Sequence, residues 1–279
     1  MDIITTLYAL WNGKQTKTTM EINKIYNENC LDTMAKMEDN FIDLTVTSPP
    51  YDNLRTYNGF EFAWEAVLKE LYRTTKKGGI VVWVVGDATV KGSETGTSFR
   101  QALYAMECGF NLHDTMIYNR LAMPNASKRY GQDFEYMFVL SKGKVKTFNP
   151  IQEPCKFAGC GTSPTSRGAK GNLVGRGRRI IKDTKKKSNI WRFTAGVGKS
   201  TKDKFAHSHP AIFPEQLAER HILSWSNIND IVYDPFMGSG TTAKMAKLNN
   251  RNYVGSEISK EYCKIIVQRL NDGAFSYLC

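Results

Sequence analysis

The sequence of 279 residues lacks any apolar run that approaches the roughly 20 residues a membrane-spanning helix needs. Its first residues, MDIITTLYALWNGKQTK, also lack a basic start and a small-residue cleavage site, so we do not interpret them as a secretory signal. Both absences lead us to expect a cytoplasmic protein with no membrane contact.

Paired cysteines are lacking too. The six cysteines are scattered and form no CxxC pair, which argues against a disulfide framework or a structural zinc site. Cys155 and Cys160, together with His207 and His209, are the remaining candidates for metal ligands. Their spacing does not match the usual zinc patterns, so we expect no metal.

Acidic residues are scarce in one part of the chain. The formal net charge is +11, and residues 142–204 carry 17 lysines and arginines against 3 acids. The rest of the chain has 21 basic and 24 acidic residues. A chain whose positive charge is concentrated in one segment, while the rest is nearly neutral, is typical of a protein that binds a polyanion. A charge run alone more often marks a solvated linker, so this interpretation depends on the motifs elsewhere.

Apolar runs typical of buried strands alternate with segments of helical periodicity. We predict strands at residues 41–47, 80–85, 112–118, 136–140, 231–233 and 253–255. We predict helices at residues 62–76, 98–108, 214–224, 241–248 and 260–270, the first of them stopped by Gly78 and Gly79. This alternation indicates an α/β fold with a parallel sheet covered on both faces. Between residues 142 and 204 the pattern dissolves into Gly, Ser, Thr, Lys and Arg, which predicts loops.

A glycine-containing turn gives the sharpest signal near the C-terminus. Residues 234–242, DPFMGSGTT, follow a predicted strand and open a helix, where glycines let the backbone approach a ligand closely. Glu257 ends the next strand, 17 residues beyond Gly240, and is placed to accept hydrogen bonds from a ribose diol. The turn lacks a full GxGxxG and a P-loop lysine, which argues against a dinucleotide or a triphosphate. A nucleoside with a small charged tail, such as S-adenosylmethionine, fits better than a merely structural turn.

Residues 234–242 resemble the cofactor motif of the amino-group DNA methyltransferases, and residues 47–51, TSPPY, resemble their catalytic motif. The catalytic motif comes first, as in the β group of that family, whose fold is circularly permuted. The resemblance implies a mostly parallel methyltransferase sheet with helices on both faces and S-adenosylmethionine as the cofactor. It divides the chain into a catalytic half (1–141), a basic, loop-rich target-recognition insertion (142–204) and a cofactor-binding half (205–279).

The permutation implies that the last helix leads, in space, to the first strand. Residues 22–31 resemble that strand and its turn, although Asn29 stands where family members usually have aspartate. Asparagine keeps a carbonyl oxygen that can accept from the adenine amino group. The residues that the resemblance assigns to the cofactor are Asn29, Cys30, Asp234, Phe236, Gly238, Ser239, Gly240, Thr241, Thr242 and Glu257.

Residues 48–51 supply what amino-group methylation needs. The lone pair of an exocyclic amino nitrogen is delocalised into the ring, and acceptors aimed at its hydrogens localise it for in-line attack. The Ser48 hydroxyl and the Pro49 carbonyl can accept, while Pro49 and Pro50 stiffen the turn. Tyr51 offers a ring for a base taken out of the duplex. The alternative is a proline-rich strand end with a packed tyrosine.

The choice of base follows from resemblance alone. Family patterns carry Asp or Asn at the first motif position in adenine-N6 enzymes and Ser most often in cytosine-N4 enzymes, so Ser48 favours cytosine. Adenine-N6 methylation stays open as the alternative. Carbon-5 methylation needs a cysteine nucleophile, and Cys155 after Pro154 is only a superficial match. Further alternatives are a DNA-binding protein without catalysis and an RNA or protein methyltransferase.

The basic segment lies where the family places its variable recognition region, which implies double-stranded DNA as the partner. The candidate DNA contacts are Arg167, Arg176, Arg178 and Arg179 for base edges and Lys185, Lys186 and Lys187 for phosphates. The family also implies a cytoplasmic enzyme associated with the nucleoid. A separately acting restriction endonuclease, and a monomer or a homodimer, stay open.

Three further features have two interpretations each. His209 either contacts the cofactor carboxylate or is a loop histidine. Asp87, at the end of residues 80–85, either lines the target pocket or caps the following turn. Phe134, Tyr136 and Phe138 alternate in a predicted strand and are interpreted mainly as core, with one ring near the target base as the alternative.

Overall fold

The computed structural model describes residues 20–50, 62–120, 128–194, 199–209, 212 and 214–272 of the chain. Its main element is an eight-stranded sheet. The strands, in their order across the sheet, are Lys24–Tyr26 (β1), Asn252–Ser256 (β16), Ile231–Asp234 (β15), Ile42–Thr47 (β2), Thr75–Val85 (β3), Phe134–Ser141 (β7), Asn111–Asn119 (β6) and Ile190–Arg192 (β14).

Only β7 runs against its neighbours, and the other strand pairs of the described main sheet are parallel. The sheet is therefore mostly parallel, as the sequence predicts. The first described strand, β1, pairs with β16, the last described strand. This is where a strand following the C-terminal helix belongs in an unpermuted chain, so the topology confirms the circular permutation.

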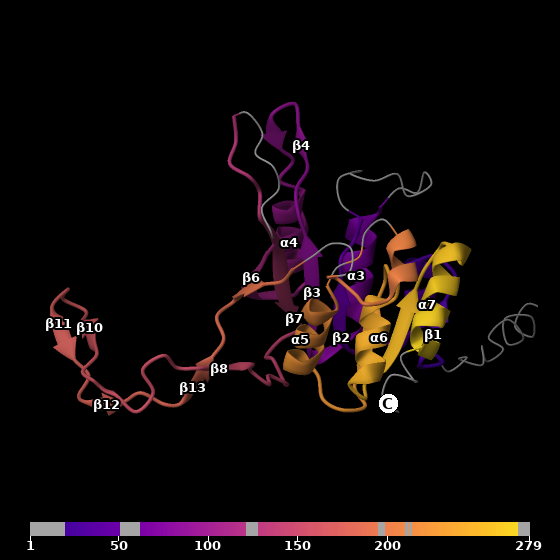
Figure 1. The fold of residues 1–279 in the computed structure, drawn as a ribbon. Helices are drawn as coiled ribbons and strands as arrows, with labels where there is room; N and C mark the ends of the chain where they lie inside the picture. Colours follow the sequence, from indigo (N-terminus) through magenta and orange to yellow (C-terminus); the bar gives the residue numbers. More distant parts are fainter. Residues whose placement is uncertain are drawn as a thin grey trace, which may run out of the picture.

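Within the described residues, six helices cover the sheet, three on each face (Figure 1). Their bounds are Cys30–Ala35 (α2), Trp64–Thr74 (α3), Thr97–Glu107 (α4), Glu215–Trp225 (α5), Thr241–Leu248 (α6) and Lys260–Asp272 (α7). Apolar side chains of α2, α3 and α4 pack in one core cluster, and those of α5, α6 and α7 in the other. Because both faces are covered, Ile80 to Val85 of β3 are buried throughout, which explains the continuous apolar run. No described helix has the length and apolar character of a membrane span.

The prediction that Gly78 and Gly79 stop a helix is wrong. Helix α3 ends at Thr74, and both glycines lie inside β3. Gly78 has a φ of +83°, and a Cβ there would lie 2.8 Å from the Cβ of Lys146. The glycine serves a close approach of two backbone segments, since its N–H donates to the Lys142 carbonyl and its own carbonyl accepts from Lys146.

Residues 152–186 form an extended arm that projects from the body (Figure 1). The predicted loops are present, but six short strands lie between them. They pair antiparallel as Gln152–Pro154 (β8) with Thr184–Lys186 (β13), Gly161–Thr162 (β9) with Arg179–Ile180 (β12), and Thr165–Arg167 (β10) with Leu173–Gly175 (β11). The chain then returns to the main sheet through β14, inside the range 142–204. The boundaries of the three-part division stay a prediction.

Two smaller elements complete the fold. Thr89–Val90 (β4) and Ser93–Glu94 (β5) form a hairpin between β3 and α4. A 3₁₀ turn at Lys204–Ser208 (η1) precedes α5 and contacts α7. This turn belongs to a segment, residues 199–209, that lies against the end of the sheet where the motifs gather.

Candidate cofactor and catalytic site

The carboxyl ends of β1, β16, β15 and β2 lie side by side, because these four neighbouring strands are parallel. The motifs predicted from the sequence follow these four ends: Asn29 and Cys30 after β1, Glu257 after β16, residues 235–240 after β15, and residues 48–50 after β2. The carboxyl edge of a parallel sheet is where α/β proteins bind ligands. The fold thus brings both halves of the predicted site to one edge.

The glycine turn between β15 and α6 has the strained shape that its sequence suggests. Gly238 and Gly240 have φ angles of +53° and +84°, which favour glycine. A Cβ on Gly238 would meet the ring of His209 at 3.0 Å, and one on Gly240 would meet Ile266 at 2.9 Å. His209 is buried and packs on Tyr262 with a ring separation of 4.3 Å, so it covers the back of the turn.

Glu257 is held against this turn by backbone donors. Its two carboxylate oxygens accept from the N–H groups of Gly238 and Ser259, each at 2.8 Å. Its side chain is buried, and burial raises the pKa of the carboxyl group in spite of these hydrogen bonds. Each oxygen keeps a further lone pair, so the group can still accept from ligand hydroxyls.

The strand end after β1 is fixed by two asparagines. Asn29 is exposed and caps α2, accepting from the Leu31 N–H at 2.9 Å. Asn27, which the sequence did not single out, donates to the carbonyls of Glu257 and Ile258 at 2.8 and 3.1 Å. Cys30 is buried, and burial raises the pKa of its thiol to about 12. Cys30 therefore lines the site as a protonated thiol.

The catalytic motif continues directly from β2. Ser48 and Pro50 are half-buried, Pro49 is buried, and Tyr51 lies outside the described residues. The preceding Thr47 donates to the Asp234 carboxylate at 2.7 Å, and Thr242 donates to the Val46 carbonyl at 3.1 Å. These bonds place residues 48–50 beside the glycine turn.

Asp234 is enclosed at the junction of the two motifs. It accepts from Thr47 and, at 3.0 Å, from the Phe236 N–H. Burial raises the pKa of this carboxyl to about 6, although its hydrogen bonds with Thr47, Phe236 and Thr242 favour its ionised form. The half-buried ring of Phe236 meets the edge of Phe62 at a centroid distance of 5.1 Å.

Asp87, for which the sequence left two interpretations open, caps α4. Its carboxylate accepts from the Ser98 N–H at 2.9 Å and from the Ser98 hydroxyl at 2.5 Å. Tyr136 and Phe138 stack at 5.3 Å in an aromatic row on β7, and Phe138 is buried. Both observations favour structural roles.

The predicted DNA contacts all lie on the arm or just after it. Arg167, Arg176, Arg178 and Arg179 are exposed on its outer part. Lys185 and Lys187 pair with Glu153 at 3.2 and 3.3 Å at the root of the arm, so their charges are partly compensated. Cys155 follows β8 in the same arm and is not at the carboxyl edge.

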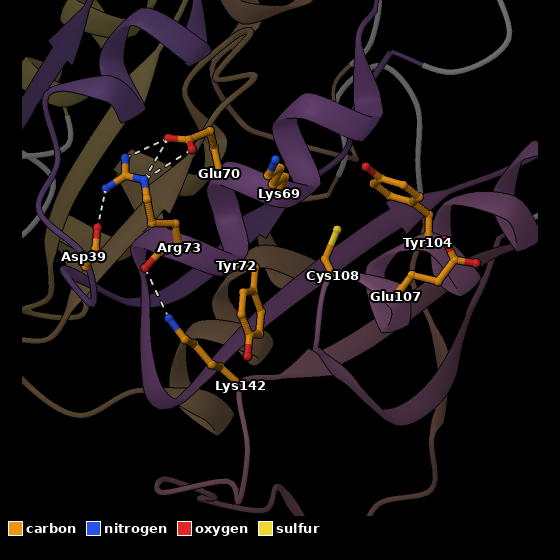
Figure 2. A pocket seen from close by; sticks show the side chains of 9 residues that line it. All are labelled: Asp39, Lys69, Glu70, Tyr72, Arg73, Tyr104, Glu107, Cys108 and Lys142. Carbon is orange, nitrogen blue, oxygen red and sulfur yellow. Dashed lines mark hydrogen bonds and ion pairs between the residues drawn. The ribbon is translucent and has the colours of Figure 1, made fainter.

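A separate cavity of about 650 Å³ lies between α3 and α4 (Figure 2). Its charged side chains are largely paired with each other: Arg73 binds Glu70 at 2.7 Å and Asp39 at 2.8 Å. Lys142 donates to the Arg73 carbonyl at 3.2 Å and lies over the ring of Tyr72. None of the predicted site residues lines it. Within the described ranges, no cluster of His, Cys, Asp or Glu is arranged to hold a metal ion.

Comparisons with known proteins agree with this geometry. Residues 42–268 match the N6_N4_Mtase family model, described as DNA methylase. The chain is 59% identical over 237 residues to the orphan methyltransferase M.BamHII of Bacillus amyloliquefaciens, covering 83% of this chain and 89% of that protein. It is 30% identical over 261 residues to the type II methyltransferase M.BglII of Bacillus subtilis, covering 90% and 69%.

Two solved structures share the fold. The PvuII DNA methyltransferase, described as cytosine-N4-specific, has a TM-score of 0.66 at 19% identity, covering 92% of this chain and 89% of its own. The complex of M1.HpyAVI with S-adenosylmethionine (SAM) has a TM-score of 0.59 at 22% identity, covering 89% and 99%. With the family model spanning most of its length, the chain belongs to the N6/N4 family of DNA methylases and is an S-adenosylmethionine-dependent DNA methyltransferase.

Proposed function

We propose that the chain methylates N4 of a flipped cytosine in double-stranded DNA. The observation that carries the proposal is the position of Ser48 and Pro49 at the end of β2, bonded through Thr47 to the cofactor turn. This placement sets two hydrogen-bond acceptors beside the place where the methyl donor belongs. Ser48 at the first motif position supports cytosine over adenine, by resemblance to the family pattern.

The residues at the carboxyl edge fit the proposed cofactor. Glu257 presents a carboxylate to the ribose hydroxyls, and the glycines of the turn at residues 235–240 let the backbone approach the ligand closely. Asn29 and Cys30 border the adenine side, and Phe236, Ser239, Thr241 and Thr242 complete the proposed contacts around Asp234, Gly238 and Gly240. When bound, S-adenosylmethionine supplies an electrophilic methyl group.

The chain's own groups then orient and activate the base. The Ser48 hydroxyl and the Pro49 carbonyl accept the two amino hydrogens and localise the nitrogen lone pair toward the methyl group. As positive charge develops on the nitrogen, the same acceptors stabilise it more strongly than they stabilise the free base. The prolines hold the acceptors in place, and the Tyr51 ring stacks on the flipped base.

The arm supports DNA as the substrate. Between residues 152 and 186 it carries 9 lysines and arginines against 2 acids. A two-stranded ribbon is one of the elements that the major groove admits. We therefore assign target recognition to the inserted segment, with the arginines of the outer arm as base or phosphate contacts.

The decisive experiment identifies the modified base. DNA methylated by the purified enzyme is digested to nucleosides and analysed by mass spectrometry. N4-methylcytosine is the expected product. N6-methyladenine would instead establish the alternative on the same fold, and 5-methylcytosine would contradict the assigned role of Ser48 and Pro49.

A further inference from the structure

One face of α7 packs along the glycine turn. Tyr262, Ile266 and Arg269 are spaced as i, i+4 and i+7, so they share a face of the helix. Tyr262 packs on His209, which lies against Gly238, and Ile266 packs against Gly240. Arg269 completes the face and bonds the turn directly.

Arg269 is fully buried, with 0% of its side chain exposed. Its Nη1 donates to the Ser239 carbonyl at 2.9 Å and to the hydroxyls of Ser239 and Thr241, each at 3.1 Å. One guanidinium nitrogen therefore bonds the residues on both sides of Gly240. The turn is thus held by two side chains: Glu257 accepts from the Gly238 N–H, and Arg269 donates to the Ser239 carbonyl.

The remaining donors of Arg269 enter a closed network of charges. Its Nε donates to Asp203 at 2.8 Å and its Nη2 to Glu215 at 2.6 Å. Lys244 donates to the same two carboxylates at 2.7 and 2.9 Å. Burial opposes ionisation of Asp203, but its hydrogen bonds to Lys244 and Arg269 lower the pKa of that carboxyl. Two cations and two anions balance, and Asp203 links the network to the segment that returns from the arm.

A buried ion-pair network of this kind is weak evidence of added stability. Replacing a buried ion pair with apolar groups is often neutral for stability, because desolvation offsets the attraction. A turn with two glycines at positive φ has wide conformational freedom, so its shape depends on contacts from outside. Arg269 supplies such a contact with a planar, fixed arrangement of donors.

We propose that Arg269 is a positioning residue that fixes the glycine turn in the conformation that receives S-adenosylmethionine. The inference rests on the proposed placement of the cofactor at this turn. Through Asp203 the same residue connects the turn to residues 199–209.

The test compares two arginine-to-lysine substitutions. Arg269→Lys keeps the positive charge but removes the planar guanidinium with its fixed arrangement of N–H donors. Arg251→Lys is the matched control, because Arg251 is half-buried between α6 and β16 and donates to the Ser226 and Asn249 carbonyls, each at 2.7 Å. The readouts are the Kd of S-adenosylhomocysteine by calorimetry, the KM for S-adenosylmethionine, kcat at saturating cofactor, and the thermal midpoint.

Arg269→Lys is expected to raise the cofactor Kd and KM about tenfold, as loss of a charge-assisted hydrogen bond would, with little change in kcat at saturation. Arg251→Lys is expected to lower the thermal midpoint and leave the cofactor Kd unchanged. Equal changes of Kd in the two variants at equal loss of stability would overturn the proposal. So would an unchanged Kd in Arg269→Lys.

A second variant covers the case in which Arg269→Lys does not fold. Asp203→Asn removes one carboxylate charge and leaves Lys244 and Arg269 paired with Glu215, and it is expected to raise the Kd by a smaller factor. An unchanged Kd there overturns the proposal. Glu257→Gln, measured alongside, separates the placement of the cofactor from the role of Arg269. If Glu257→Gln also leaves the Kd unchanged, the cofactor does not bind at this turn. If it weakens binding while the Arg269 and Asp203 variants do not, only the role of Arg269 fails.

Discussion

Thr47 donates a hydrogen bond of 2.7 Å to Asp234, and this bond joins the residue before the catalytic motif to the first residue of the cofactor motif. The two residues are 187 positions apart in the chain but adjacent in the fold, because β2 and β15 pair in parallel. Both side chains are buried, so the bond is not exchanged for water. It fixes the end of β2 relative to the glycine turn.

Replacing Thr47 by valine is expected to destabilise the protein. The substitution keeps the shape and removes one of the hydrogen-bond donors to the buried Asp234 carboxylate. We expect a loss of about 1–3 kcal/mol in the free energy of unfolding, measured with urea.

Thr45→Val in the same strand is the matched control for Thr47→Val. The Thr45 hydroxyl is buried and has no hydrogen-bond partner among the described residues. Its removal should be neutral or stabilising. If Thr45→Val and Thr47→Val lower the free energy of unfolding equally, the Thr47–Asp234 bond makes no specific contribution to stability.

Glu257→Ala is expected to weaken cofactor binding at least tenfold, since unpaired buried hydroxyls cost roughly 1–3 kcal/mol each. Calorimetry with S-adenosylhomocysteine measures the change. Glu261→Gln is the control, because Glu261 is an exposed glutamate on the neighbouring helix. Unchanged affinity in Glu257→Ala would remove Glu257 from the site.

The elements around this site were predictable from the sequence because their signals are local. A continuous apolar run predicts β3, and glycines between a strand and a helix predict the turn at residues 235–240. The catalytic and cofactor motifs meet because both follow parallel strands. The order of the strands, and so the proximity of Thr47 to Asp234, was not predicted, because the resemblance implied only that the last helix leads to the first strand.

Arg269 had no local signal, because its acidic partners lie 54 and 66 positions away. An arginine on an amphipathic helix is normally exposed, and only the fold buries this one. The strands of the arm were missed for a different reason. Most of their residues are exposed, so the sequence has no alternation of apolar and polar residues to mark them.

His221 predicts how stability depends on pH. It is fully buried, and burial lowers the pKa of its ring from 6.5 to about 3. Between pH 6.5 and 3 the His221 ring is protonated in the unfolded chain but neutral in the folded chain. The free energy of unfolding therefore falls as the pH falls through this range. The slope has a limit of about 1.4 kcal/mol per pH unit for one proton. Asp234, whose pKa is raised to about 6, acts in the opposite direction between pH 6 and 3.8, because the folded state there binds the extra proton.

The contribution of His221 is isolated by comparing the wild type with His221→Asn, in which Asp234 is unchanged. Asparagine keeps an acceptor for the Trp225 N–H, which now donates to the His221 Nδ1 at 3.3 Å. Urea unfolding at pH 8, 6.5 and 5 should show a cost of the substitution that is largest at pH 8 and shrinks as the solution is acidified. A constant difference across this range would mean that His221 titrates alike in the folded and unfolded states.

The exposed arginines of the outer arm predict how DNA binding depends on salt. Arg176, Arg178 and Arg179 lie between and within the β11 and β12 strands, with no acidic residue between positions 154 and 182 to compensate them. Arg176 donates to the Ser166 hydroxyl at 2.9 Å, which uses one of its donors and leaves its charge. Changing all three to glutamine should weaken DNA binding and flatten the slope of log affinity against log salt. The expected change is up to about 0.9 for each phosphate that the variant no longer neutralises.

Two comparisons make this measurement specific. The triple change of Lys185, Lys186 and Lys187 to glutamine should have a smaller effect on the slope, because Glu153 already compensates part of that charge. Lys77, Lys91 and Lys264 are exposed on the body, and their change to glutamine should leave the slope as in the wild type. Cofactor affinity should be unchanged in the two arm variants, because their substituted residues do not lie at the carboxyl edge of β15 and β16. If the arginine triple variant binds DNA with the wild-type slope, these three arginines belong only to a solvated surface, and the DNA-binding residues must lie elsewhere in the protein.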